Sequence, residues 1–242
     1  MNMNQTVINS KQNIDAACSS CFRQLVNYSA KVREHKKEVE RVAALPYIQE
    51  EKMRQIDELE AKTKAQLSSI YTAVIGQIDV ISEAAEAIAE APMDSVDLSA
   101  VGTLISITGG GSSAESAVAI SGVLQDYAYQ YRGQQKALRV IKAAMERMGD
   151  SGSNVLKSKY GGSLIFCVSE RTGKLYRITE RLREINLSHA FVLARELEVF
   201  AYDMGVELAD NFKKMMNAVN PDDYEGAYLE RMASLMGLDG QV

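Results

Sequence analysis

Two cysteines spaced as Cys18-Ser-Ser-Cys21 are the first candidates for chemistry, because this is the spacing of dithiol redox pairs and of half a zinc site. A structural zinc site needs about four ligands, whereas the rest of the chain adds one Cys and two His, His35 and His189. A redox pair usually lies at a helix start, beside positive partial charge. The apolar spacing around both cysteines instead places them inside a helix already under way. We therefore interpret them, and both histidines, as structural, and we predict no metal site.

A glycine-rich run, Gly109-x-Gly111-x-x-Ala114, follows an apolar stretch and precedes a helical pattern, which is the order found in a dinucleotide fingerprint. Such glycines let backbone N–H groups approach a pyrophosphate at a helix start. The fingerprint also needs a second strand and an acidic residue about 20 positions later. Here the helical pattern continues through Gln134 to Lys136, where that strand would be. We predict a hairpin tip between helices at these glycines, and no cofactor.

Acidic side chains are abundant, but none belongs to a recognisable catalytic arrangement. They alternate with basic residues at helical spacing, as in Glu58 with Lys62 and Glu60 with Lys64. Such pairs are typical of solvated helix faces. No set of Ser, His and acid can be singled out for nucleophilic catalysis. We therefore expect that the protein is not an enzyme.

The composition indicates which elements hold these side chains. Of 242 residues only three are Pro and none is Trp, while 46% are apolar. This composition favours long helices over a sandwich or barrel rich in turns. We predict a mainly α fold, an elongated helical bundle that begins with a long antiparallel helical hairpin.

The amino terminus and the cysteine count bear on the compartment. Residues 1–13 are polar and lack the basic start and apolar stretch of a signal peptide. Three Cys are too few for a disulfide framework. No run holds the roughly 18 apolar residues that a membrane-spanning helix requires. We expect a cytoplasmic protein, or one built into a particle that forms in the cytoplasm.

The first helical segment carries one narrow apolar stripe. Its members follow one another at alternating steps of four and three, which predicts a helix packed along a coiled-coil-like seam. The predicted interaction seam consists of Ile14, Cys18, Cys21, Leu25, Tyr28, Val32, Val39 and Val42, with His35 in the same stripe.

Pro46 separates this segment from a second helical one. Proline disfavours a helical conformation in the preceding residue and is well tolerated at a helix start. The second apolar stripe runs from Met53 to Ile88. We predict an antiparallel hairpin over residues 1–91, with a single rod kinked at Pro46 as the alternative.

Residues 92–150 form the second predicted domain. Between residues 96 and 124 only two side chains are charged, and glycines interrupt the middle of this stretch. The run from Ser112 to Glu115 fits a capping box, which predicts that a third long helix starts there and ends at Gly149.

Residues 151–242 form the third predicted domain. An apolar run, a turn containing Gly and a second apolar run predict a small β-hairpin near residues 163–178. Helical spacing resumes at about residue 179, with an interruption near residues 186–188. An Asn-Pro-Asp-Asp start and a closing Gly predict a final helix over residues 220–237.

Charge is unevenly distributed along the chain, although the net charge is only −5. Between Lys64 and Arg132 there are eight acidic residues and no basic one, whereas from Arg132 to Glu184 twelve basic residues stand against five acidic ones. Such segregation could orient subunits as they associate, form a local face for nucleic acid, or be an ordinary solvated surface. The candidate polyanion face consists of Arg132, Lys136, Arg139, Lys142, Lys174, Arg177 and Arg181.

Long helices with narrow apolar stripes cannot cover one another fully within one chain of this length, so some stripe is left for partners. We predict a non-enzymatic structural or assembly protein that acts through helix packing and self-association, such as a scaffold or a component of a phage virion or secretion apparatus. Its partners would be further copies or other protein subunits, and no small-molecule substrate. Two alternatives stay open. One is membrane insertion of the low-charge hairpin 96–124, and the other is nucleic-acid binding through the basic stretch 132–183.

Overall fold

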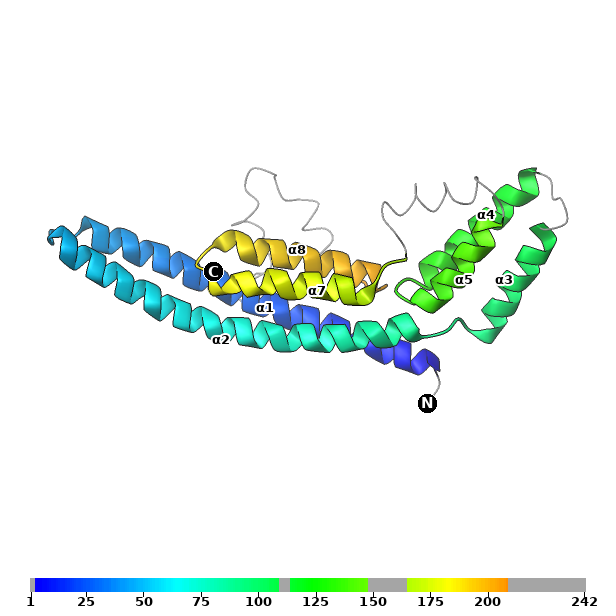
Figure 1. Ribbon diagram of the computed structural model, residues 1–242, viewed down its shortest axis with the longest axis horizontal. Coiled ribbons are helices and arrows are strands. Elements are labelled where there is room, and N and C mark those ends of the chain that lie inside the picture. The colour runs from blue at the N-terminus through cyan, green and yellow to red at the C-terminus, as the bar shows by residue number, and fades with distance from the viewer. Residues whose placement is uncertain (1–2, 109–113, 148–164, 209–242) are drawn as a thin grey trace. The chain divides into compact units, whose positions relative to one another are not determined.

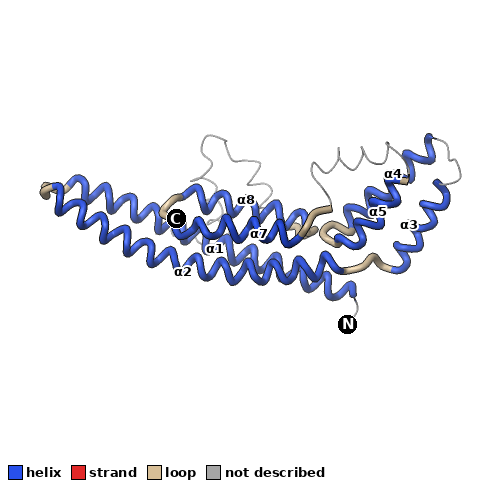
Figure 2. The backbone as a smooth tube through the Cα atoms, viewed as in Figure 1, coloured by secondary structure: helices blue, strands red, loops and turns tan. Residues whose placement is uncertain are grey.

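The computed structural model describes residues 3–108, 114–147 and 165–208, which form α-helices and one short 3₁₀ helix (Figure 1, Figure 2). No strand occurs among these described residues. The mainly α fold predicted from the composition is confirmed.

Two long helices open the chain as an antiparallel hairpin, as predicted. α1 spans Met3–Ala44 and α2 spans Gln49–Glu90. Pro46 lies in the turn between them and is therefore a hairpin corner, not a kink in one rod. Lys52 closes this corner, because its Nζ donates a 2.7 Å hydrogen bond to the carbonyl of Ala43, which is among the last carbonyls of α1 and has no partner within the helix.

The chain forms two compact units, each assembled from segments that are distant in the sequence. The first unit, here called the α3–α5 unit, contains Met1–Ile14, Ser82–Arg171 and Phe200–Val206. The second, here called the hairpin unit, contains Asp15–Ile81, Thr172–Val199 and Glu207–Val242.

Three short helices pack together in the α3–α5 unit. They are α3 (Ser95–Thr108), α4 (Ala114–Gln130) and α5 (Gln135–Glu146). Their shared core is apolar and includes Val101, Leu124, Leu138, Ile141 and Met145. The run before the glycines is thus helical, not the strand that a dinucleotide-binding unit requires.

The single long helix predicted after the glycines is wrong, because a turn at residues 131–134 divides it into α4 and α5. Gly133 in this turn has a φ of +85°, which lies outside the helical region. A Cβ at this position would lie 2.8 Å from the carbonyl oxygen of Met204. The turn therefore packs directly against the backbone near Met204, a tertiary contact that helical periodicity does not reveal.

The small β-hairpin predicted near residues 163–178 is wrong where the structure describes it. α7 spans Val168–Thr179 and continues into the 3₁₀ helix η1 (Glu180–Arg183). Gly173, the expected turn residue, lies inside α7. The buried side chains of α7 follow one another at steps of four and three, with one adjacent pair at the end, and therefore lie on one face of a helix. They are Val168, Thr172, Leu175, Ile178 and Thr179.

The interruption predicted near residues 186–188 is confirmed, since α8 begins at Leu187 and runs to Asp203. Asn186 caps it, because its Oδ1 accepts the backbone N–H of Ser188 at 3.0 Å. η1 and α8 therefore meet at a sharp corner, and α7 and α8 lie side by side as a second antiparallel pair (Figure 1).

Three predicted features lie outside the described residues. They are the glycine tip at residues 109–111, the helix end at Gly149 and the final helix over residues 220–237.

Candidate interaction surface

In the hairpin unit, α7, η1 and α8 cover only part of the α1–α2 hairpin (Figure 1). The corner between η1 and α8 is bonded to Tyr28 of α1, and η1 is bonded to Tyr71 of α2. Between Tyr28 or Tyr71 and the turn at Pro46, no other described helix of this unit lies along the hairpin. We call residues 15–32 and 67–81 the proximal hairpin, and residues 33–66 the distal hairpin.

The apolar stripe of the proximal hairpin is buried. Most of the predicted interaction seam lies here, and the structure places it in the core of the chain itself. Side chains with an exposed fraction of 0% include Cys18, Cys21, Leu25 and Tyr28 of α1 and Leu67, Val74, Ile78 and Ile81 of α2. α7, η1 and α8 lie along this part of the hairpin (Figure 1), and their Leu175, Leu182, Leu193 and Leu197 are buried as well.

The side chain of Tyr28 in α1 binds the η1–α8 corner. Its hydroxyl group lies within hydrogen-bond distance of the carbonyl of Glu184, and 3.1 Å from the carbonyl of Asn186. The hydroxyl oxygen also accepts the N–H of Asn186 at 3.4 Å. Burial raises the pKa of Tyr28. The hydroxyl therefore keeps its proton at neutral pH and can donate it to one of these two carbonyls.

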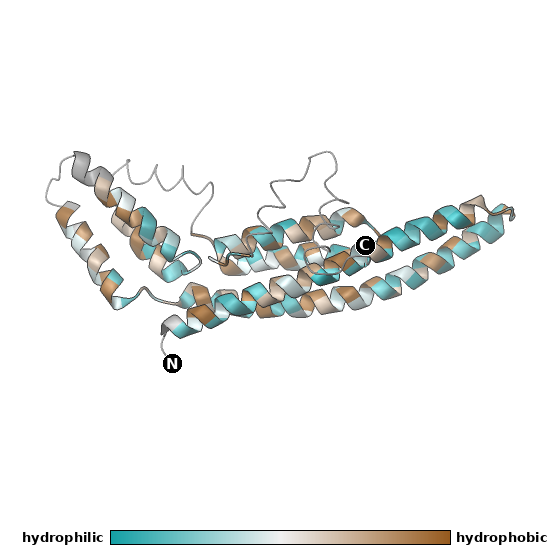
Figure 3. Cartoon of the chain, turned by 180° about the vertical axis from the view of Figure 1, so that it is seen from behind, coloured by the Kyte–Doolittle hydropathy of each residue, from teal (hydrophilic) through white to brown (hydrophobic). Residues whose placement is uncertain are grey.

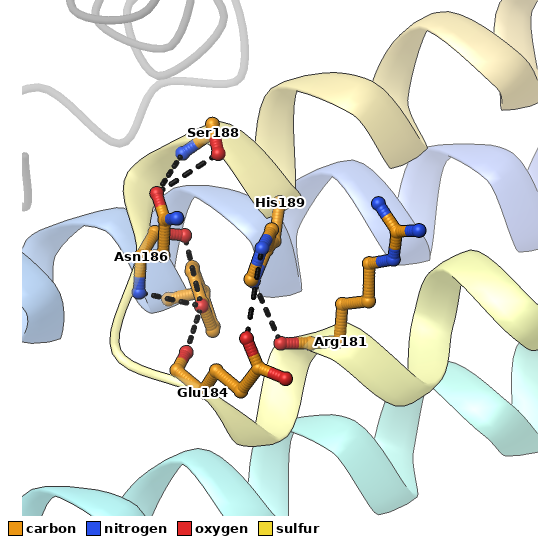
Figure 4. A network of polar contacts seen from close by, with 6 residues as sticks. Arg181, Glu184, Asn186, Ser188 and His189 are labelled. Carbon is orange, nitrogen blue, oxygen red and sulfur yellow. Dashed lines mark hydrogen bonds and ion pairs between the residues drawn. The ribbon is translucent and has the colours of Figure 1, made fainter.

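His189 lies inside the same corner (Figure 4). Its Nδ1 is 2.8 Å from the carbonyl oxygen of Arg181, which can only accept, so we assign the proton to Nδ1. Its Nε2 lies 3.8 Å from the carboxylate of Glu184. His189 thus donates a hydrogen bond that fixes the end of α7 and η1 against α8.

α2 is bound to α7 and η1 through side chains. The hydroxyl of Tyr71 donates a 2.6 Å hydrogen bond to the carboxylate of Glu180, and the guanidinium of Arg183 lies 4.1 Å from the centroid of the Tyr71 ring. One turn earlier in α7, Tyr176 donates to the carboxylate of Asp79 at 2.6 Å. The proximal hairpin is therefore held to its neighbours by apolar packing and by polar contacts at its edges.

The distal hairpin has almost no buried core. Only Val42 and Thr63 are buried among residues 33–66, all of which the structure describes. The apolar stripe continues through side chains of intermediate exposure, namely His35, Val39, Leu45, Ile56 and Leu59. Three large apolar side chains near the turn are exposed, Tyr47 by 47%, Ile48 by 73% and Met53 by 49%. These three residues were not among the sequence-predicted site residues.

One polar pair interrupts the distal stripe. The hydroxyl of Thr63 donates its only proton to the carbonyl of Leu59 at 2.9 Å, so it accepts from Nδ1 of His35 at 3.1 Å. A hydrogen bond inside an apolar stripe is lost when one helix slides along the other. The pair therefore favours a single register of α1 on α2.

Charged side chains surround the distal stripe in equal numbers, with eight basic and eight acidic residues between positions 33 and 66. Many pair along their own helix, such as Glu38 with Arg41 at 2.8 Å and Glu60 with Lys64 at 2.6 Å. Hydrogen bonds from Arg54 lower the pKa of Glu51 to about 2. Hydrophilic and hydrophobic residues are interspersed along this part of both helices (Figure 3). The distal hairpin is thus neutral, whereas the whole chain carries −5.

The candidate polyanion face is divided between the two units. The α3–α5 unit contains its members Arg132, Lys136, Arg139 and Lys142, and the hairpin unit contains Lys174, Arg177 and Arg181.

Several of these basic side chains are engaged inside their own unit. Arg132 has an exposed fraction of only 4%, and its guanidinium lies 4.1 Å and 4.4 Å from the ring centroids of Tyr129 and Tyr202. Three others form ion pairs, namely Lys136 with Glu90, Lys142 with Glu146 and Lys174 with Glu196. The pair of Lys136 with Glu90 joins the basic and acidic stretches of the sequence within one unit.

The cysteines differ in their surroundings. Burial raises the pKa of Cys21 to about 12 and that of Cys18 well above its ordinary value, so neither is a thiolate at neutral pH. Cys167 is exposed just before α7, where the hydroxyl of Ser169, 3.0 Å from its Sγ, lowers its pKa. Cys167 was not among the sequence-predicted site residues, and it lies in a segment that was predicted as a strand. Within the described ranges, no group of three or more His, Cys, Asp or Glu could hold a metal ion.

The described parts of the low-charge segment 96–124 lie in α3 and α4, which have 14 and 17 residues. Of the helices that the structure describes, none combines the length and the apolar character needed to cross a bilayer. Comparison of the chain with known protein families, with curated proteins and with solved structures gave no match.

Proposed function

We propose that this chain is a structural or assembly protein that acts by packing its helices against further copies of itself. The strongest support comes from the distal hairpin. Its two helices share an apolar stripe that remains partly exposed, because the two helices alone do not cover it. Helices in proteins gain most of their stability from tertiary packing of such a stripe. We therefore expect the uncovered side of these two long helices to pack against another chain.

The composition of the distal surface also supports this proposal. Protein interfaces combine an apolar centre, often with Tyr and Met, with a polar rim that contains Arg. The distal hairpin offers Tyr47, Ile48 and Met53 beside paired charges that include Arg41 and Arg54. Its neutral charge removes the electrostatic penalty that like-charged surfaces would meet on association.

The nucleic-acid alternative has less support from the geometry. One of its basic residues is buried, and three are paired with acidic side chains. A phosphate backbone is bound by several cations that act together, and each intramolecular ion pair reduces that number.

Light scattering across a wide range of protein concentrations tests the proposal. We expect the mass to rise from the 26.6 kDa of one chain toward a whole multiple as the concentration increases. Because the association is attributed to apolar packing, it should persist at high salt. A mass of one chain at every concentration would contradict the proposed function.

A further inference from the structure

Resting on the proposed self-association, we infer that the distal hairpins of two copies pack into one four-helix bundle with two-fold symmetry. Residues 33–66 of each copy supply two of the four helices. The partner's distal hairpin lies along α1 and α2 on the side where α7 and α8 cover the proximal hairpin.

The proximal hairpin provides the precedent for this arrangement. There the same two helices, α1 and α2, are joined by a second antiparallel pair, and the shared stripe becomes fully buried from Cys18 to Tyr28. The distal hairpin has the same helices and a continuing stripe, yet all of its apolar members except Val42 are only half-buried or exposed. A second copy offers what the distal half lacks, an antiparallel pair of helices with a matching apolar side.

Within this two-fold dimer we take the two distal hairpins to be antiparallel, because this direction brings apolar side chains together at both ends of the bundle. In an antiparallel arrangement, the turn of one copy reaches the base of the other copy's distal hairpin, where the η1–α8 corner lies. That corner carries Ile185 and Leu187, both of intermediate exposure, and the turn carries the exposed Tyr47 and Ile48. Apolar side chains therefore meet at both ends of the bundle.

Charge favours a second copy over other occupants. The distal hairpin has eight acidic and eight basic side chains, so two copies meet there without net repulsion. A nucleic acid or an anionic membrane would gain no net attraction from a neutral surface. Two identical surfaces that carry both signs can also pair opposite charges across a two-fold axis.

Sedimentation equilibrium of the full chain and its variants tests whether the distal hairpin forms the dimer interface. The double substitution Ile48→Glu and Met53→Glu places charges in the bundle and should raise the dimer Kd by at least about 30-fold. Both side chains are exposed in the single chain, so its helical circular dichroism and melting temperature should stay unchanged. Val80→Glu is the matched control, since Val80 is 41% exposed on α2 outside the distal hairpin and should leave the Kd unchanged.

Cross-linking tests the geometry. One protein carries Ile48→Cys and the other Leu187→Cys, both with Cys167→Ser, and the mixture is treated with a short bismaleimide. Native Cys18 and Cys21 are buried and do not compete. We expect a cross-linked dimer from this mixture. None should form when Val199→Cys, exposed farther along α8, replaces Leu187→Cys.

The possible results separate the inference from the proposed function. A single-chain mass at all concentrations would overturn both. A dimer that tolerates the double glutamate substitution and gives no Ile48–Leu187 cross-link would overturn the inference alone and leave self-association standing. A dimer that is lost in the double variant, kept in Val80→Glu and cross-linked at the stated positions would support both.

Discussion

The proximal and distal halves of the α1–α2 hairpin consist of the same two helices and one continuous stripe, yet their burial differs sharply. Leu25 in the proximal half has an exposed fraction of 0%, whereas Leu59 in the distal half is only partly buried. The helices do not differ in kind between the halves. What differs is the presence of α7 and α8. Heptad spacing thus specifies which side chains share a stripe, but not how many helices cover that stripe.

Leucine-to-alanine substitutions should give the largest contrast between the halves. Leu25→Ala leaves a cavity in a covered core and should lower the free energy of unfolding by about 3 kcal/mol. Leu59→Ala removes the same atoms from a half-covered position and should cost about 1 kcal/mol in the single chain. Urea unfolding at low protein concentration measures both. Equal losses would remove the distinction between the two halves.

Tyr28→Phe should have an intermediate effect. The substitution leaves the N–H of Asn186 and the two corner carbonyls without the hydroxyl, at an expected cost of about 1–2 kcal/mol. Tyr47→Phe, at an exposed position near the turn, is the control and should leave the unfolding free energy of the single chain unchanged. A Tyr28→Phe protein as stable as the parent would show that packing alone holds the corner.

Alkaline pH should weaken the proximal half selectively. The pKa of Cys21 is raised to about 12 in the folded chain from an ordinary value of 9.0. A raised pKa means that the folded state prefers the protonated thiol. The associated stability is complete below about pH 9 and is lost as the pH rises toward 12. Unfolding free energies measured between these values should fall less steeply for Cys21→Ala. Identical slopes for parent and variant would contradict the role of burial.

The smallest effect is expected at the charged rim of the distal half. Arg54→Ala removes ion pairs with Glu51 and Glu58 that are exposed to solvent. Exposed pairs of this kind contribute little to stability and are screened by salt. The melting temperature of the single chain should not change measurably. A clear destabilisation at Arg54 would mean that charge pairing, not apolar packing, maintains the distal hairpin.

The sequence was sufficient where local spacing or a special residue decides the structure. Alternating steps of three and four predicted the stripe of α1, Pro46 predicted the hairpin turn, and the break before Leu187 followed from a lapse in apolar spacing. These features depend on neighbours in the chain and are independent of distant contacts.

The predictions from sequence were wrong where a contact with a distant part of the chain decides the structure. The turn at Gly133 exists beside the backbone of Met204, which no local pattern reveals. A short apolar run fits a strand or a buried helix equally well, so α7 was predicted as a β-hairpin. The burial of the predicted seam also depends on distant contacts, which local spacing does not show. The predicted seam from Ile14 to Val32 is buried in this chain, while Tyr47 and Ile48, in a turn without periodicity, are exposed.

Amide hydrogen exchange measured at several protein concentrations tests the pairing of distal hairpins most directly. We predict that the protection of residues 33–66 increases with concentration, while residues 15–32 and 67–81 keep a constant, higher protection. Protection of residues 33–66 that stays the same from dilute to concentrated protein would contradict the account.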